Sequence, residues 1–406
     1  MAATKKRNAY RGLIAWMLVF LALCALCFAG YLYTRNYLSA RAKQNEEDVL
    51  KINAERTQEY NAAMAEHQQQ SAADKDMQWP AAAASGWDVV DLTAYPVSEG
   101  SLTTVTRKEM LEGGLLLINR WHMMPADLTD DMMISISRTS RADEDKNNNI
   151  PTTNSSLMLQ PVAVNALMKL YGDARAAGLD MDGIIVSEGY RTMEQQTSLW
   201  NKKVESLSGS YSGERLNEMA MRSTAYPGTS DYQTGLSVFV YNYKKGDNEF
   251  TSTLLHETEQ GKWLYQNCWK YGYIFRYPIQ GFPYADTVDK SFKTGYTDQM
   301  KVYRYVGVAN AAAMNTLGMC LEEYIEYLMA HPHIAVYSDG TLKYEIYRME
   351  GGYSDTAVTV PYGAASYSAS TDNMDGLSVP ITYYDYMQPK PKPIIAKIRH
   401  QGFFHR

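Results

Sequence analysis

The chain has 406 residues, of which 45% are hydrophobic, 12% aromatic and 21% charged. This composition excludes an intrinsically disordered chain, and a mean hydropathy of −0.38 excludes a protein made mostly of membrane spans. The 39 basic and 45 acidic residues give a net charge of −6. We expect no nucleic-acid partner, because such proteins carry a basic surface. The length predicts two or three folded units.

The N-terminal sequence has the pattern of a membrane anchor. Residues 1–11 contain Lys5, Lys6, Arg7 and Arg11 and no acid, and residues 12–33 contain no charge. About twenty apolar residues span a bilayer, and basic residues ahead of the span keep that end in the cytoplasm. We therefore predict a cytoplasmic tail at 1–11, a single transmembrane helix at 12–33 and an extracellular remainder, in the cell membrane.

Two other interpretations of this segment stay open. A cleaved signal peptide would usually have a shorter apolar region, of about 7–15 residues. A lipoprotein would attach its lipid at Cys24 or Cys27, but a leucine rather than a small residue precedes each cysteine.

A helical stalk and linker are predicted at 34–87. Residues 36–76 are rich in Ala, Glu, Gln, Lys and Arg and contain neither Pro nor Gly, which favours helix. Arg56 falls where a coiled-coil seam should be apolar, so a strong coiled coil is not predicted. The stalk nevertheless offers a route to oligomerisation.

The following sequence predicts a compact domain at 88–331. In chain order we expect a buried strand within 115–125, a helix within 157–178, a strand from 183, a helix at 193–204, strands at 236–243 and 273–278, and a helix at 319–330. Short β-rich runs then predict an appendage at 332–388, followed by a Pro-rich tail at 389–406. The predicted fold class is α+β, with helices around a small antiparallel sheet.

Four ordered blocks carry a resemblance to a known family. They are SEGYRTMEQQ (187–196), PGTSDYQTGLSVF (227–239), WLYQNCWKYGYIFRYP (263–278) and TGYTDQMKVYRYVG (294–307). The stretch 115–328 resembles the VanY-like D,D-carboxypeptidases, zinc peptidases that remove the terminal D-Ala from peptidoglycan stem peptides. Several blocks in the family's order are far more specific than one short motif.

The resemblance also implies where the catalytic residues should stand. The family takes its zinc ligands and general base from S-x-H-x-x-G-x-x-x-D and E-P-W-H. In this chain the ligand positions are occupied by Tyr232, Phe239 and Val302, and the general-base position by Gln299.

These replacements remove the chemistry of the family. Phe239 and Val302 offer no lone pair to a metal, and Gln299 cannot accept a proton. Tyr232 would ligate only as a phenolate, and its reference pKa is about 10. We therefore predict a pseudoenzyme that binds no zinc and has no other cofactor.

Two other groups of residues are candidates for a different route to hydrolysis. The candidate histidines are His122, His256, His331 and His333, of which the pair His331 and His333 is expected in a surface turn. Ser230 would need a neighbouring base to act as a nucleophile, and its motif contains none. An active peptidase stays a third hypothesis.

The resemblance implies that some recognition residues survive. Tyr190, Arg191 and Gln196 match Y-R-x-x-x-x-Q, and Ser230 matches a further pocket residue. In the family the Arg and Gln face the end of the stem peptide, where a guanidinium can hold a carboxylate through two hydrogen bonds.

An internal role for Arg191 is the alternative, as an ion-pair partner of Glu194 or Asp231. Glu188 stands where the family has a small serine, and it adds negative charge beside a site meant for an anion.

Two function hypotheses follow. The first is a cell-wall protein that binds peptidoglycan stem peptides or a cell-wall or membrane protein partner without cleaving them. The second is a structural module of a membrane complex that binds no peptide. Cys268 and Cys320 are expected to be two separate buried thiols, although an oxidising compartment would permit a disulfide.

Overall fold

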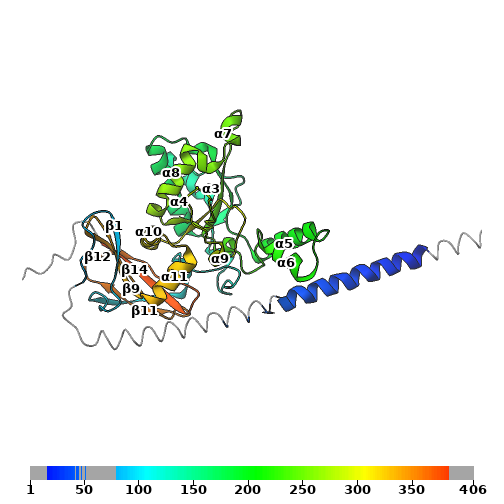
Figure 1. Cartoon of the computed structure of the whole chain (residues 1–406), viewed down its shortest axis with the longest axis horizontal. Helices are drawn as coiled ribbons and strands as arrows, with labels where there is room; N and C mark the ends of the chain where they lie inside the picture. The colour runs from blue at the N-terminus through cyan, green and yellow to red at the C-terminus, as the bar shows by residue number, and fades with distance from the viewer. Residues whose placement is uncertain (1–15, 42, 45–46, 48–50, 52–78, 384–406) are drawn as a thin grey trace, which may run out of the picture. The chain divides into compact units, whose positions relative to one another are not determined.

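The computed structural model describes residues 16–41, 43–44, 47, 51 and 79–383 (Figure 1). The predicted tails 1–11 and 389–406 lie outside these residues, as do 52–78 of the predicted stalk. The chain divides into two units, 1–54 and 55–406, and each is described by itself.

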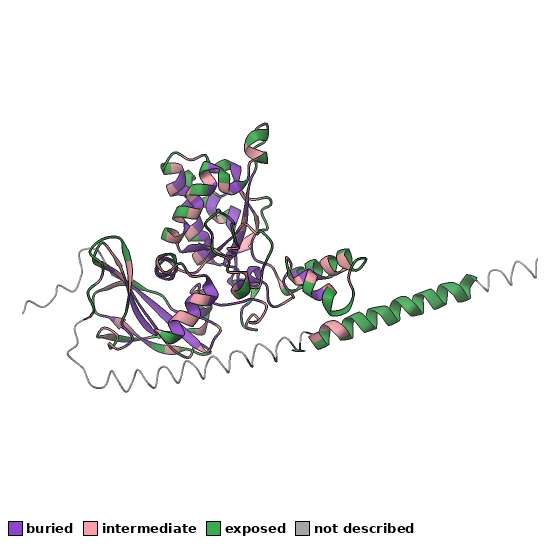
Figure 2. Cartoon of the chain, in the orientation of Figure 1, coloured by how far each residue is buried: buried purple, intermediate pink, exposed green. Residues whose placement is uncertain are grey.

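The first unit contains one apolar helix, Trp16–Arg41. It has 26 residues, a mean hydropathy of 2.1 in its most apolar window, and no buried residue in that window (Figure 2). At 1.5 Å per residue it is long enough to cross the hydrocarbon core of a bilayer, which is about 30 Å thick.

A four-stranded antiparallel sheet forms the centre of the second unit. Its order is β5 (Ile184–Glu188), β6 (Ser237–Asn242), β8 (Val302–Tyr305) and β7 (Tyr273–Phe275). One face packs against α4 (Pro161–Ala176), where Val186, Val238 and Tyr303 join Leu167 and Tyr171 in a buried core. Because side chains alternate along a strand, the opposite face carries Ser237, Phe239, Val302 and Arg304.

A second, six-stranded sheet combines one early strand with the strands after His331. The order is β1 (Trp87–Asp91), β9 (His333–Ser338), β10 (Thr341–Glu350), β14 (Gly376–Tyr383) and β12 (Ala364–Tyr367), and β13 (Ser370–Thr371) also pairs with β14. Two short antiparallel ribbons are β2 (Gly100–Val105) with β11 (Thr356–Pro361), and β3 (Ile134–Ser135) with β4 (Met158–Leu159).

Helices α10 (Val308–Leu317) and α11 (Leu321–Ala330) belong to a core that both sheets share. Ile274 and Val306, from the region of the four-stranded sheet, lie in the same cluster as Ile334 and Ile346 of the six-stranded sheet. The remaining α-helices are α2 (Arg107–Glu112), α3 (Ile136–Ala142), α5 (Met193–Leu207), α6 (Gly213–Met221), α7 (Asn248–Ser252), α8 (Glu259–Asn267) and α9 (Ser291–Thr294). The architecture confirms a mixed helical and antiparallel-sheet fold.

The predicted strand within 115–125 is not part of either sheet. Leu115–Ile118 is fully buried, as its apolar sequence indicates, but it pairs with no strand. The Leu115 N–H donates to the Ser370 hydroxyl instead of to a neighbouring strand, and the carbonyl groups of Gly114 and Leu116 accept from Arg304. The hydrophobic run is buried as predicted, but most of its hydrogen bonds are to side chains, and the Leu117 N–H donates to the Asp372 carbonyl outside any strand pairing.

Candidate functional site

The first part of the site is a tight turn. Ser230 precedes the 3₁₀ turn Asp231–Thr234, whose Gln233 side chain accepts the backbone N–H groups of Gly228 (2.8 Å) and Ser230 (3.4 Å). The turn ends at Gly235, whose φ of 69° favours glycine. A Cβ there would also lie 2.3 Å from the Met133 sulfur. These motif residues therefore hold the backbone in shape, whether or not chemistry takes place beside it.

The strands then bring two of the expected ligand positions, Phe239 and Val302, together. In the ladder, Glu188 is paired with Phe239, and Phe239 is paired with Val302. Paired residues on neighbouring strands project from the same face of a sheet. Glu188, Phe239 and Val302 thus form one row across β5, β6 and β8.

Tyr232 joins this row to form an apolar cluster. Tyr232 and Val302 are buried together with Ala225, Tyr277 and Tyr296, and Phe239 and Met300 pack against them. The rings of Tyr277 and Tyr296 lie 4.5 Å apart between centroids. All three expected ligand positions therefore contribute to a single hydrophobic cluster.

Zinc does not fit the residues present in this cluster. Phe239 and Val302 have no donor atom, and burial raises the pKa of Tyr232 well above its usual value, which keeps the phenol protonated. Gln299 lies in the exposed loop before β8. Within the described ranges no three His, Cys, Asp or Glu side chains are grouped to hold a metal ion.

Arg191 lies over the Tyr232 ring, with its guanidinium carbon 4.0 Å from the ring centroid. Its Nε and Nη2 donate to the same oxygen of Glu188, at 3.3 and 3.0 Å, and its Nη1 donates to Gln196 at 3.1 Å. The alternative of an internal ion pair is thus realised, but the expected partner was wrong. The i,i+3 spacing and the end of β5 place Glu188, rather than Glu194 or Asp231, against the guanidinium.

The other predicted recognition residues also have intramolecular partners. The buried Gln196 amide donates to the Ala225 carbonyl at 2.7 Å, and the Tyr190 hydroxyl donates to Asp130 at 2.5 Å. Ser230 is buried at the start of the turn. Tyr190 and Arg191 still adjoin the turn, because the Arg191 N–H donates to the Tyr232 carbonyl at 3.3 Å.

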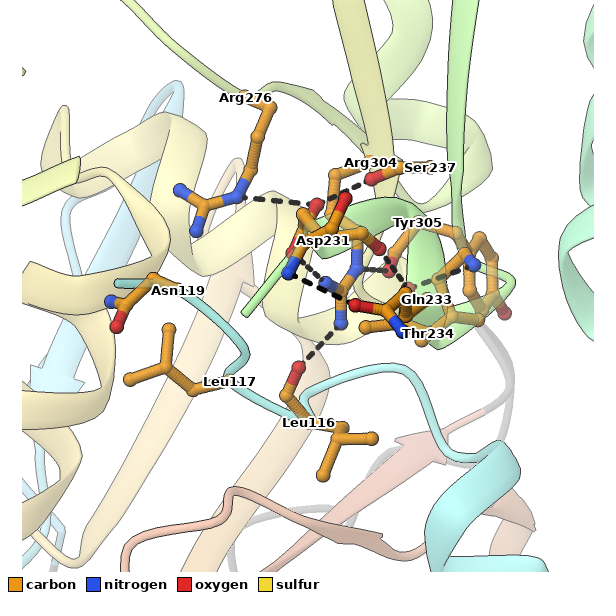
Figure 3. A network of polar contacts seen from close by, with 12 residues as sticks. Leu116, Leu117, Asn119, Asp231, Gln233, Thr234, Ser237, Arg276, Arg304 and Tyr305 are labelled. Atoms are coloured by element: carbon orange, nitrogen blue, oxygen red, sulfur yellow. Dashed lines mark hydrogen bonds and ion pairs between the residues drawn. The ribbon is translucent and has the colours of Figure 1, made fainter. Parts of the chain in front are cut away.

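A buried ionic network adjoins the turn, with Asp231, Arg276 and Arg304 as its members drawn in Figure 3. Asp231 pairs with Arg304 and lies 3.4 Å from Arg276, and the Ser237 hydroxyl also donates to it. Arg276 makes two hydrogen bonds to Glu322 of α11, at 2.9 and 2.7 Å. Two cations thus balance two anions in the interior, and the network joins the turn, β7, β8 and α11.

The sequence analysis did not predict this ionic network. Arg276 and Arg304 stand in the FRYP and RYVG stretches, where they served only to mark the register of the motifs. An arginine in each of two β-rich stretches was the available signal, since a buried arginine requires an acidic partner. Glu322 could not have been paired with them by sequence spacing.

The candidate histidines have other partners. Nδ1 of His331 lies 2.8 Å from Asp91, and Nε2 of His333 lies 3.0 Å from Glu345. His331 is partly exposed, but His333 is buried at the start of β9, so the expectation that both lie in a surface turn was wrong for His333. His122 is buried beside Asn119, and His256 contacts Phe282 edge-on.

The two cysteines beyond the apolar helix are separate. Cys268 and Cys320 are both buried and free. Burial raises the pKa of Cys268 to about 12, so its thiol is unreactive. The prediction of two separate buried thiols is confirmed.

Comparison with known proteins identifies the family that the four sequence blocks indicate. A family model described as VanY, D-alanyl-D-alanine carboxypeptidase, matches residues 156–307. A D-alanyl-D-alanine carboxypeptidase of Enterococcus faecalis is 31% identical over 229 residues, covering 55% of this chain and 70% of the relative. Another from Enterococcus faecium is 26% identical over 278 residues, covering 68% of this chain and 78% of the relative.

A solved structure shows the same fold. The vancomycin resistance D,D-dipeptidase VanXYg, in complex with a D-Ala-D-Ala phosphinate analog, aligns with a TM-score of 0.50 and 23% identity. The alignment covers 70% of this chain and all of that one. With the turn, the four-stranded sheet and the ordered motifs in place, the chain belongs to the VanY family of D-alanyl-D-alanine carboxypeptidases.

Proposed function

We propose that this protein is a membrane-anchored, extracellular pseudoenzyme that binds peptidoglycan stem peptides without cleaving them. The observation that carries the loss of hydrolysis is the cluster of Tyr232, Phe239 and Val302, which places apolar groups where a metal would need ligands. Gln299 supplies no general base. The fold is retained because the turn and the buried ionic network do not depend on a metal.

Metal content and D-Ala release test the loss of hydrolysis. The full-length chain, purified in detergent, should hold no stoichiometric zinc and release no D-Ala from a pentapeptide stem. One equivalent of zinc that survives mild chelation, or D-Ala release above a blank, would overturn the pseudoenzyme proposal.

Arg191 supports the proposal of peptide binding. Its side chain keeps 17% of its surface exposed, and its hydrogen bonds to Glu188 and Gln196 use three of its five N–H groups. The other two can donate to an oxygen of a ligand. Names of relatives point to D-Ala-D-Ala ends as the ligand class.

Substitution of Arg191 tests peptide binding. In calorimetric titration the full-length chain should bind a D-Ala-D-Ala stem peptide without metal, and Arg191→Ala should weaken binding about tenfold or more, because a hydrogen bond to a charged group contributes about 1.5–3 kcal/mol. Arg215→Ala is the matched control, since Arg215 is exposed on α6 and pairs only with Glu218 in the described structure. Equal binding by both variants would refute the role of Arg191.

A scaffold function is the second candidate. It is favoured by the intramolecular partners of Tyr190, Arg191 and Gln196, which give each residue a structural use. If the wild type binds no stem peptide and Arg191→Ala lowers the unfolding free energy by several kcal/mol, the residue is structural and the scaffold function is supported.

A further inference from the structure

Glu188 places a negative charge inside the candidate peptide site. It is the last residue of β5, and the ladder pairs it with Phe239, on the face that carries Val302. A register shift between Val186 and Glu188 produces this pairing. The Glu188 side chain is 45% exposed, so it borders the solvent from which a ligand would enter.

The carboxylate of Glu188 already neutralises the cation of the site. One of its oxygens accepts from both Nε and Nη2 of Arg191, which is the two-donor edge that a ligand carboxylate would use. Tyr232 covers one face of the same guanidinium. A ligand carboxylate therefore meets a neutral ion pair and a second carboxylate, and like charges within a few ångströms repel.

A neutral ligand group does not meet this repulsion. The N–H groups of Arg191 that remain on Nη1 and Nη2 can donate to a carbonyl oxygen, and the exposed part of Glu188 can accept an amide N–H. The pair thus presents donors and an acceptor side by side. This arrangement is complementary to an amide and not to an anion.

We propose that Glu188 determines specificity by making the site prefer a stem peptide whose C-terminal end is a neutral amide over one with a free carboxylate. The proposal rests on the proposed function, because it concerns the same peptide site. The ligand class is a D-Ala-containing peptide whose last carboxyl group is blocked, by an amide cap or by an amide bond to another chain.

A matched pair of peptides tests the preference. Two synthetic D-Ala-D-Ala stem peptides, one with a terminal carboxylate and one with a terminal carboxamide, are titrated into the full-length protein in detergent. The wild type should bind the carboxamide more tightly, by about fivefold. Glu188→Gln should reverse the order, with affinity for the carboxylate rising on the order of tenfold, because Arg191 regains an unpaired charge.

Glu194→Gln is the control for a general change in charge. Glu194 is exposed on the first turn of α5, and no described contact joins it to Arg191, so its variant should keep the wild-type preference. Thermal melting checks that Glu188→Gln folds, and the wild-type preference is informative without any variant.

Three results would overturn the inference. If the wild type prefers the carboxylate, or if Glu188→Gln leaves the ratio of affinities unchanged, Glu188 does not set specificity and the proposed function still stands. If neither peptide binds to the wild type or to Glu188→Gln, the proposed function fails, and the inference fails with it.

Discussion

At the scale of single residues, the three positions where the family's metal ligands are expected carry side chains that pack in one hydrophobic cluster. Val302 and Phe239 are paired across two strands, as ligands of one metal could be, yet both contribute only apolar surface. Tyr232 and Tyr296 pack beside them, and burial of this apolar surface stabilises the cluster.

Restoring one ligand should therefore destabilise the protein. Val302→His places a polar, larger ring in a fully buried position, and overpacking with an unpaired polar group should lower the unfolding free energy by about 2–4 kcal/mol. Added zinc should not raise the melting temperature, because Phe239 supplies no second ligand. Denaturant unfolding with and without zinc measures both effects.

Gln299→Glu is the control for this variant. Gln299 is exposed, so its substitution should change the unfolding free energy by no more than about 0.5 kcal/mol. A rise in melting temperature on adding zinc to Val302→His would show that the cluster still contains a usable metal site.

At the scale of elements, buried charge joins β7 to α11. Arg276 follows β7, and its two hydrogen bonds to Glu322 connect this strand end with the first turn of the helix. Both side chains are buried, so neither charge is solvated when its partner is removed. Lys293 and Glu326 pair at 2.6 Å nearby in sequence, but both are about a third exposed.

These two pairs should respond differently to loss of the cation. Arg276→Met should lower the unfolding free energy by about 3–5 kcal/mol, because it leaves Glu322 buried without its counter-ion. Lys293→Met should cost less than about 1 kcal/mol, since water screens that pair. Urea unfolding of both variants gives the comparison.

The double variant Arg276→Met, Glu322→Leu should recover part of the loss, because Asp231 keeps its pair with Arg304. Equal costs for Arg276→Met and Lys293→Met would show that the buried pair does not hold β7 to α11.

At the scale of the whole molecule, the buried carboxylates Glu322 and Glu345 pair with Arg276 and His333. These buried pairs should make the stability of the fold sensitive to acid. Burial raises the pKa of Glu322, but the charge and hydrogen bonds of Arg276, together with the Asn119 amide, lower the pKa below its ordinary 4.5. Burial also raises the pKa of Glu345, but His333 and the hydrogen bonds from Ser98 and Tyr383 together lower the pKa of this carboxyl below 4.5.

Stability should consequently fall at low pH. A carboxyl group with a depressed pKa in the folded state stabilises the fold above its unfolded pKa and loses that contribution as pH falls through the folded value. The unfolding free energy should be nearly constant from about pH 7 to 5 and drop below pH 4.5. Unfolding of Glu322→Gln should show a shallower decline below pH 4.5 than the wild type, and an unchanged slope would contradict this account.

The apolar helix gives a prediction of topology for the whole chain. If Trp16–Arg41 is an intact anchor with its basic end inside, protease added to intact cells should digest the residues that follow and spare the N-terminus. An epitope at each end, probed before and after permeabilisation, measures this. Recovery of a soluble form that begins near Gly30 would show a cleaved signal instead.

The sequence by itself determined the family, the main secondary-structure elements and which amino acids stand at the expected ligand positions. Local signals account for this: Thr192 caps helix α5 through a capping box, and Gly235 ends the turn that Ser230 precedes. Such signals depend on residues that are close in sequence, so they can be recognised without knowledge of the rest of the fold. The absence of ligand atoms in Phe239 and Val302 is a property of the side chains alone.

Only the tertiary structure decided which charges meet. Glu194 and Asp231 were the partners expected for Arg191, but the structure pairs Arg191 with Glu188 at the end of β5, while the buried Asp231 pairs with Arg304. The pairing of Arg276 with Glu322, 46 residues later, depends on α11 packing against the end of β7. Ion pairs are chosen by distances in space and by exclusion of water, and a linear sequence contains neither quantity.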